Sequence, residues 1–254
     1  MRITWYGTAC VAIDTKETKL LFDPFVPWKG SSAPVRLSDF DGFDRIFLTH
    51  GHFDHAESLP KILNRNPAAV VYCTATPHKT LRRRGVPKYN LKRITPGTQT
   101  LIGDVRIRVY QSCHAKLEVD LKDRILDKRL IQYSCNLAHM VYANLLYREN
   151  NETLLYELYT EEKRVLLMGS MNLCEGVHYP DSCDLLILPY AGYLDNDPVA
   201  VRIINRLCPK EVMLTHFDDT FPPMTRPMDL GRIREFKGCK ITVPEYKETI
   251  SYWM

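Results

Sequence analysis

Three histidines and an aspartate lie within six positions of the stretch LTHGHFDH at residues 48–55. His50 and His52 are two residues apart, so at an extended strand end their side chains leave the same side and can hold one ion together. Asp54 and His55 follow after a bend and can turn toward a second ion. Neutral imidazole and carboxylate groups suit zinc, and also iron or manganese, at neutral pH. The spacing predicts a metal site rather than a polar loop that is rich in histidine by chance.

Two apolar strands are predicted to place histidines at their carboxyl ends. RIFLTH at residues 45–50 and EVMLTH at 211–216 both end in Leu-Thr-His, and open α/β folds keep their sites at such strand ends. The shared ending is either a chance similarity or a sign that the chain contains two similar halves. VRIRVY at 105–110 alternates as a half-buried strand does. DLLILP at 184–189 is apolar throughout, as expected of a central strand covered on both faces.

The remaining pattern is that of a layered α/β protein. Helices are predicted at residues 55–65, 76–85 and 198–208, between further short strands. Residues 115–150 interrupt the strand rhythm and are predicted to form a helical insertion. Such a segment is either a lid over the site or a peripheral insertion that buries only its own apolar face. Because no linker is visible, a single domain over residues 1–254 is expected.

The composition is typical of a globular protein, with 254 residues of which 45% are hydrophobic and 25% charged. The formal net charge of +4 is too mild to indicate nucleic acid by itself. We expect no secretory signal, because the start of the sequence lacks a charged region followed by an apolar core. No apolar run approaches the roughly 18 residues that a membrane helix needs. A cytoplasmic protein that binds no membrane is therefore expected. Eight cysteines occur without a C-x-x-C pair, so we expect reduced thiols that mostly fill the core and no cysteine zinc site.

The histidine-rich loop closely resembles the H-x-H-x-D-H signature of the metallo-β-lactamase superfamily of metal-dependent hydrolases. The likeness covers nearly the whole chain. LLFDPF at residues 20–25 is similar to the family's Asp-Pro turn, His114 in VYQSCHAK matches a lone histidine after a later strand, and His216 matches one that ends a strand near the C-terminus. The resemblance implies a four-layer αββα sandwich. The opening WYGTACVAI is similar to that of the ascorbate-phosphate-lactonase-like group of predicted zinc-dependent hydrolases.

The resemblance also implies which residues form the site. One ion is held by His50, His52 and His114, and a second by Asp54, His55 and His216. Asp23 orients a ligand imidazole through a hydrogen bond, unless it only forms an Asp-Pro turn. Asp54 also moves a proton during the reaction. The expected cofactor is zinc, as one or two ions, with manganese or iron as alternatives.

The sequence departs from the family pattern at Ser170. The family's glycine-acid motif supplies an aspartate that bridges both ions, whereas the matching stretch here is RVLLMGSMN at residues 164–172. A neutral serine lacks the charge that offsets the repulsion between two cations. Either a bridging hydroxide alone keeps the pair of ions, or only one site fills, or a nearby group substitutes, the candidates being Asn172, Glu175 and His178. We expect a weakened second site.

These features predict a hydrolase that uses a metal-bound hydroxide, since the sequence has no Gly-x-Ser-x-Gly elbow and no signature of a cysteine nucleophile. The expected substrate is a small, polar or anionic ester, lactone or phosphate. One alternative is a nuclease or phosphodiesterase that binds nucleic acid through Arg82–Arg84, although a helix C-terminus explains such a cluster equally well. The other is a non-catalytic metal-binding relative, because of Ser170. Self-association into a homo-oligomer is left open.

Overall fold

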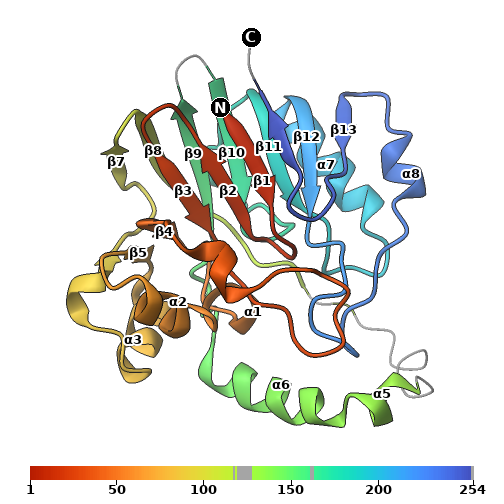
Figure 1. The fold of residues 1–254 in the computed structure, drawn as a ribbon. Helices are drawn as coiled ribbons and strands as arrows, with labels where there is room; N and C mark the ends of the chain where they lie inside the picture. The colour runs from red at the N-terminus through yellow and green to blue at the C-terminus, as the bar shows by residue number, and fades with distance from the viewer. Residues whose placement is uncertain (117, 119–127, 161–162, 253–254) are drawn as a thin grey trace.

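The computed structural model describes residues 1–116, 118, 128–160 and 163–252 (Figure 1). It contains two seven-stranded sheets that face each other. The first has the order β14-β1-β2-β3-β4-β5-β6 and consists of β1 Arg2–Trp5, β2 Val11–Asp14, β3 Lys19–Phe22, β4 Arg45–Phe47, β5 Val70–Cys73, β6 Leu91–Arg93 and β14 Thr249–Ser251. The second has the order β13-β12-β11-β10-β9-β8-β7 and consists of β7 Gln99–Ile102, β8 Val105–Gln111, β9 Leu154–Thr160, β10 Lys163–Met168, β11 Cys183–Pro189, β12 Pro209–Thr215 and β13 Lys240–Thr242.

Three apolar cores separate four layers of structure. One core is packed between the two sheets and contains Trp5 and Phe22. A second lies between the first sheet and its helices and contains Leu59. The third lies between the second sheet and its helices and contains Leu186 and Ile204. The four-layer αββα sandwich implied by the sequence resemblance is therefore confirmed.

The outer layers contain the three predicted helices and, in addition, a short helix near the C-terminus and two 3-10 turns that were not predicted. Beside the first sheet are α1 Phe53–Ala56, α2 Leu59–Arg65 and α3 Ala75–Arg83, with the 3-10 turns η1 Leu37–Phe40 and η2 Lys88–Asn90. Beside the second are α7 Asp197–Leu207 and α8 Gly231–Arg234 (Figure 1). The helix predicted at residues 55–65 is split into α1 and α2, and those predicted at 76–85 and 198–208 correspond to α3 and α7. None of the described helices has the length and apolar character needed to cross a membrane.

Both sheets repeat the same order of strand pairings. In each, four strands pair antiparallel and three more extend the sheet in parallel. The two halves are therefore alike in architecture. The two strands that end in Leu-Thr-His are not equivalent, however. β4 is the first of the three parallel strands in the first sheet, whereas β12 is the second of the three in the second sheet.

The predicted insertion at residues 115–150 contains two helices, α5 Arg129–Gln132 and α6 Ser134–Leu146, which lie below the sheets in Figure 1. Residues 117 and 119–127 of this prediction lie outside the described residues. Ala143 of α6 and the following Tyr147 are buried in the core beside the first sheet. Met140 of α6 lines the cavity described below. The helical content is thus confirmed, whereas a role as a lid stays a prediction.

The prediction that the cysteines are reduced core residues is partly wrong. Cys113 and Cys174, which are 61 residues apart, form a disulfide. Cys135 and Cys208 are exposed. The buried free cysteines are Cys10, Cys73 and Cys183. Sequence spacing cannot reveal the disulfide, because its partners meet only when β8 and β10 lie in one sheet with their carboxyl ends at the same edge.

Candidate metal centre

The histidine-rich loop follows β4, which pairs in parallel with β3 and β5. Gly51 lets this loop pass close to the segment before β9, because a Cβ atom here would lie 2.2 Å from the carbonyl oxygen of Arg148. The chain then enters α1, with His52 as its N-cap residue. Asp54 and His55 consequently lie in a helical turn, and both are buried.

Two strands of the second sheet deliver the remaining histidines. His114 follows β8, and His216 directly follows β12. His216 has a backbone φ of 60°, a left-handed conformation that costs a non-glycine residue on the order of 1–3 kcal/mol and is frequent at functional sites. Its N–H donates to the carbonyl oxygen of Thr8 at 2.8 Å. That bond fixes the turn in which the chain leaves the strand.

His50, His52 and His114 form the first triad, and their candidate ligand atoms all lie within 4.8 Å of one another. Nε2 of His50 is 3.2 Å from Nδ1 of His52. Nδ1 of His114 donates to the carbonyl oxygen of Ala115 at 2.8 Å, which leaves Nε2 available for an ion. This grouping is compatible with one ion shared by three imidazoles.

Asp54, His55 and His216 form the second triad, with candidate ligand atoms again within 4.8 Å of one another. Oδ2 of Asp54 lies 3.1 Å from Nε2 of His216 and 3.6 Å from Nε2 of His55. The ring centroids of His50 and His55 are 3.9 Å apart, so the two triads adjoin. The structure brings all six expected ligands together in the expected two groups, and their binding of ions stays a prediction.

Asp23 lies directly behind the second triad. Its side chain is completely buried, and its carboxylate accepts hydrogen bonds from the N–H and the Oγ1 of Thr49 at 2.7 and 2.6 Å. Nδ1 of His55 lies 3.0 Å from Oδ2 of Asp23. This contact would hold the proton of His55 on Nδ1 and direct Nε2 toward the site, and the orienting role expected from the sequence stays a prediction.

The protonation states of the first triad fit a metal site. Burial lowers the pKa of His50 well below its ordinary value and that of His52 to about 4, and it also lowers the pKa of His114. These imidazoles are therefore neutral at physiological pH, the form that binds a metal ion. In the second triad, burial opposes ionisation of Asp54, but His55 and His216 hold its pKa below the usual range. The donor set of neutral imidazoles and one carboxylate suits zinc.

We expect the two triads to respond differently to pH. Burial alone would lower the pKa of His55, but Asp23 and Asp54 raise it. An ion that binds Nε2 must then displace a proton, so affinity for the second triad should fall with decreasing pH by up to about tenfold per unit below that pKa. The first triad should change little.

Cobalt(II) titrations between about pH 6 and pH 8, around the histidine pKa, measure this difference. The His216→Ala variant keeps the first triad intact, and His114→Ala keeps the second. Parallel pH slopes in the two variants would contradict the assignment.

Both triads line one cavity of about 760 Å³. Ser170 lines it too, and its Oγ accepts a hydrogen bond from the N–H of Ala115 at 2.9 Å. Asn172 donates instead to the carbonyl oxygen of His114, while Glu175 and His178 are exposed. None of these last three residues lines the cavity. This arrangement does not support the suggestion that one of them replaces the missing aspartate, and all three outcomes for Ser170 stay predictions.

Sequence reasoning missed three residues that shape the site. Thr49 connects Asp23 to the loop. The feature of the sequence that could have pointed to it is the Leu-Thr-His ending of the strand. Gly169 packs closely against Thr49, since a Cβ atom at Gly169 would lie 2.3 Å from Cβ of Thr49. Glu149 lines the cavity, and its Oε1 accepts hydrogen bonds from the N–H and Oγ1 of Thr153 at 3.1 and 2.7 Å.

The chain resembles several known proteins in sequence. A family model described as "Beta-lactamase superfamily domain" matches residues 18–217. A UPF0173 protein of Pyrococcus abyssi is 30% identical over 146 residues, which are 57% of this chain and 65% of that protein. A UPF0173 metal-dependent hydrolase of Archaeoglobus fulgidus is 26% identical over 254 residues, which are 99% of this chain and 98% of that protein. The chain thus covers just under two thirds of the first relative and nearly all of the second.

Solved structures share the fold at low sequence identity. Igni18, a metallo hydrolase from Ignicoccus hospitalis, has a TM-score of 0.65 at 15% identity, with 100% of this chain and 98% of that chain covered. CmlA, a diiron β-hydroxylase from Streptomyces venezuelae, has a TM-score of 0.62 at 15% identity, with 99% and 54% covered. The family model covers all six ligand residues and ten of the fourteen described strands. It shows that the chain belongs to the metallo-β-lactamase superfamily, whose fold these solved structures share.

Proposed function

We propose that this protein is a metal-dependent hydrolase that uses zinc and water to cleave a small-molecule ester, lactone or phosphate. The observation that carries the proposal is the meeting of two ligand triads, from three separate parts of the chain, in a single cavity. A water nucleophile fits, because the sequence has no Gly-x-Ser-x-Gly elbow and no signature of a cysteine nucleophile. A cytoplasmic location, which is expected from the sequence, stays a prediction, and self-association stays open.

The residues of the two triads have distinct roles in this proposal. His50, His52 and His114 would hold one ion, and Asp54, His55 and His216 a second. Bound zinc lowers the pKa of water to about 7 and so provides hydroxide at neutral pH. Asp54 is ionised and lines the cavity, so it can take up the proton of the attacking water and pass it to the leaving group.

The lining of the cavity narrows the substrate class. Apolar side chains such as Phe221 and Met224 line it and suit an apolar part of a substrate. Arg226 is the only arginine or lysine among the described lining residues, whereas carboxylates include Glu118 and Glu149. The zinc ions of the proposed site would offset these carboxylates, so the preference rests on the apolar side chains. Within the predicted range of substrates we favour an ester or lactone with an apolar part.

The structure gives little support to a nucleic-acid substrate. Arg82–Arg84 lie at the C-terminal end of α3, and none of them lines the cavity. A guanidinium nitrogen of Arg82 donates to the carbonyl oxygen of Val86 at 2.5 Å, a local structural role. The non-catalytic alternative is favoured by one observation only, the serine at position 170.

A metal count and a chelation experiment test the proposal. We expect purified protein to contain one to two zinc ions per chain, with one ion indicating a site weakened by Ser170. A chelator should abolish hydrolysis of a panel of para-nitrophenyl esters, lactones and phosphodiesters, and zinc should restore it. If iron or manganese restores activity and zinc does not, the metal of the site is not zinc. Metal-loaded protein that cleaves none of the panel would favour the non-catalytic alternative.

A further inference from the structure

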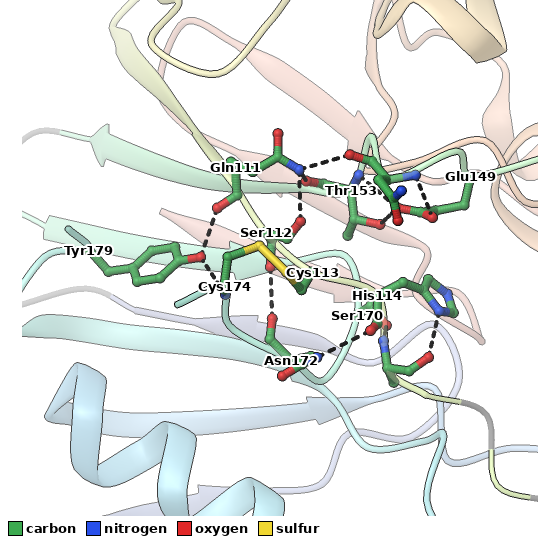
Figure 2. Close-up of a disulfide and its surroundings, with 12 residues drawn as sticks. Gln111, Ser112, Cys113, His114, Glu149, Thr153, Ser170, Asn172, Cys174 and Tyr179 are labelled. Atoms are coloured by element: carbon green, nitrogen blue, oxygen red, sulfur yellow. Dashed lines mark hydrogen bonds between the residues drawn. A yellow bond between two sulfur atoms is a disulfide. The ribbon is translucent and has the colours of Figure 1, made fainter. Parts of the chain in front are cut away.

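We propose that the Cys113–Cys174 disulfide is a redox-sensitive clamp that positions His114, so that the oxidation state of this pair sets the metal affinity of the first triad. The inference rests on the metal binding that the proposed function requires, but not on the substrate. Figure 2 shows the disulfide next to His114 and close to Ser170, two residues that line the metal cavity. The two cysteines are therefore positioning residues for a metal ligand.

The clamp joins two segments that the sheet does not pair. β8 and β10 run in the same direction, since each is antiparallel to β9, which lies between them. Strands separated in this way are about 10 Å apart, twice the usual distance between neighbours. The Cα atoms of Cys113 and Cys174 are only 5.1 Å apart. The segments after the two strands thus converge beyond the end of β9, where the described residues form no ladder of backbone hydrogen bonds between them.

Hydrogen bonds connect the same two segments beside the disulfide (Figure 2). Oγ of Ser112 donates to the carbonyl oxygen of Asn172 at 2.9 Å, and Nδ2 of Asn172 donates to the carbonyl oxygen of His114 at 3.2 Å. The N–H of Ala115 donates to Oγ of Ser170 at 2.9 Å. The loop after β10 therefore holds His114 itself and the residues on both sides of it.

A dithiol reductant can open the clamp, because both cysteines are partly exposed. A thiolate of the reductant attacks one sulfur, so a mixed disulfide forms and the S–S bond of the protein breaks. The second thiol of the reductant then attacks the mixed disulfide, which releases that cysteine and closes the disulfide of the reductant. Two electrons pass to the protein, and Cys113 and Cys174 take up the two protons of the reductant's thiols. The hydrogen bonds described above then remain between the two segments. Because loss of a residue that orients a ligand typically weakens metal binding by about 10–100-fold, we expect a decrease of this size at the first triad.

Metal titrations of the full-length protein test the clamp. The samples are oxidised wild type, wild type reduced with a dithiol that is then removed without oxygen, and the Cys113→Ser/Cys174→Ser variant. The matched control is Cys135→Ser/Cys208→Ser, which removes two exposed thiols that do not line the cavity. Zinc competition titrations give the affinity for each ion, and the visible spectrum of bound cobalt(II) reports the ligand geometry.

We expect one ion to bind about 10–100-fold more weakly in reduced wild type and in the double-serine variant, with a changed cobalt spectrum. Reoxidation of wild type should reverse the change, and the second ion and the control should be unaffected. Unchanged affinity after reduction, or an equal loss for both ions together with lower thermal stability, would overturn the clamp. Oxidised wild type that binds no ion would overturn the proposed function as well. If ions bind with the expected redox dependence and no substrate is cleaved, the proposed function alone fails.

Discussion

The His52→Ala variant is expected to lose the ion of the first triad and to hydrolyse substrate at least about a thousandfold more slowly than wild type. His52 supplies Nδ1, 3.2 Å from Nε2 of His50, and alanine leaves two ligands where structural and catalytic zinc sites use at least three. A metal ion stabilises the transition state by several kcal/mol, and about 4 kcal/mol corresponds to a thousandfold in rate. Elemental analysis and kcat/KM for a cleaved ester measure both losses.

His78→Ala is the matched control for this variant. His78 lies on α3, is not among the residues that line the cavity, and is partly exposed like His52. We expect it to retain metal and activity. Both variants should unfold close to wild type in their metal-free forms, because neither removes a fully buried side chain. Full activity of His52→Ala would refute the metal centre.

The sequence was sufficient to name the ligands of the candidate site but not what holds them in place. Four of the six are local in H-x-H-x-D-H, and the other two follow strands, so each could be recognised without knowing its neighbours. The contact of Asp23 with Thr49 spans 26 residues and depends on the parallel pairing of β3 with β4. Likewise, the need for Gly169 becomes visible only when its segment is packed against Thr49.

The fold was predictable where strands are long and strongly patterned. β8 alternates between buried and exposed residues, and nearly all of β11 is buried. Both strands could therefore be predicted from the hydrophobic pattern of the sequence. The short strands β6, β7 and β14 lie at or beside sheet edges and have mostly exposed or half-buried side chains, which removes the hydrophobic period. The disulfide could not be predicted for a different reason: the pairing of distant cysteines follows from tertiary packing and not from their spacing in the sequence.

Replacing Asp23 with asparagine is expected to lower the free energy of unfolding by about 3–5 kcal/mol and the zinc affinity of the second triad by about 10–100-fold. Asp23 has a backbone φ of 47°, which asparagine tolerates, so the substitution acts on the side chain. The amide keeps the size of the carboxylate but replaces an acceptor oxygen with an NH2 group. It therefore removes a hydrogen bond from Thr49 or from His55 and leaves a buried polar group without its partner.

The stability loss in metal-free protein should also depend on pH. Burial opposes the charged form of His55, but Asp23 and Asp54 raise its pKa. A raised histidine pKa adds stability below the unfolded pKa of about 6.5, and this contribution disappears as pH rises through the folded pKa. Urea unfolding should therefore show a larger cost of Asp23→Asn at about pH 5 than at about pH 9. Asp181→Asn, at a side chain that is 98% exposed, should change neither value. Equal costs at the two pH values would mean that His55 is neutral in the metal-free fold, and the ion pair with Asp23 would have to be abandoned.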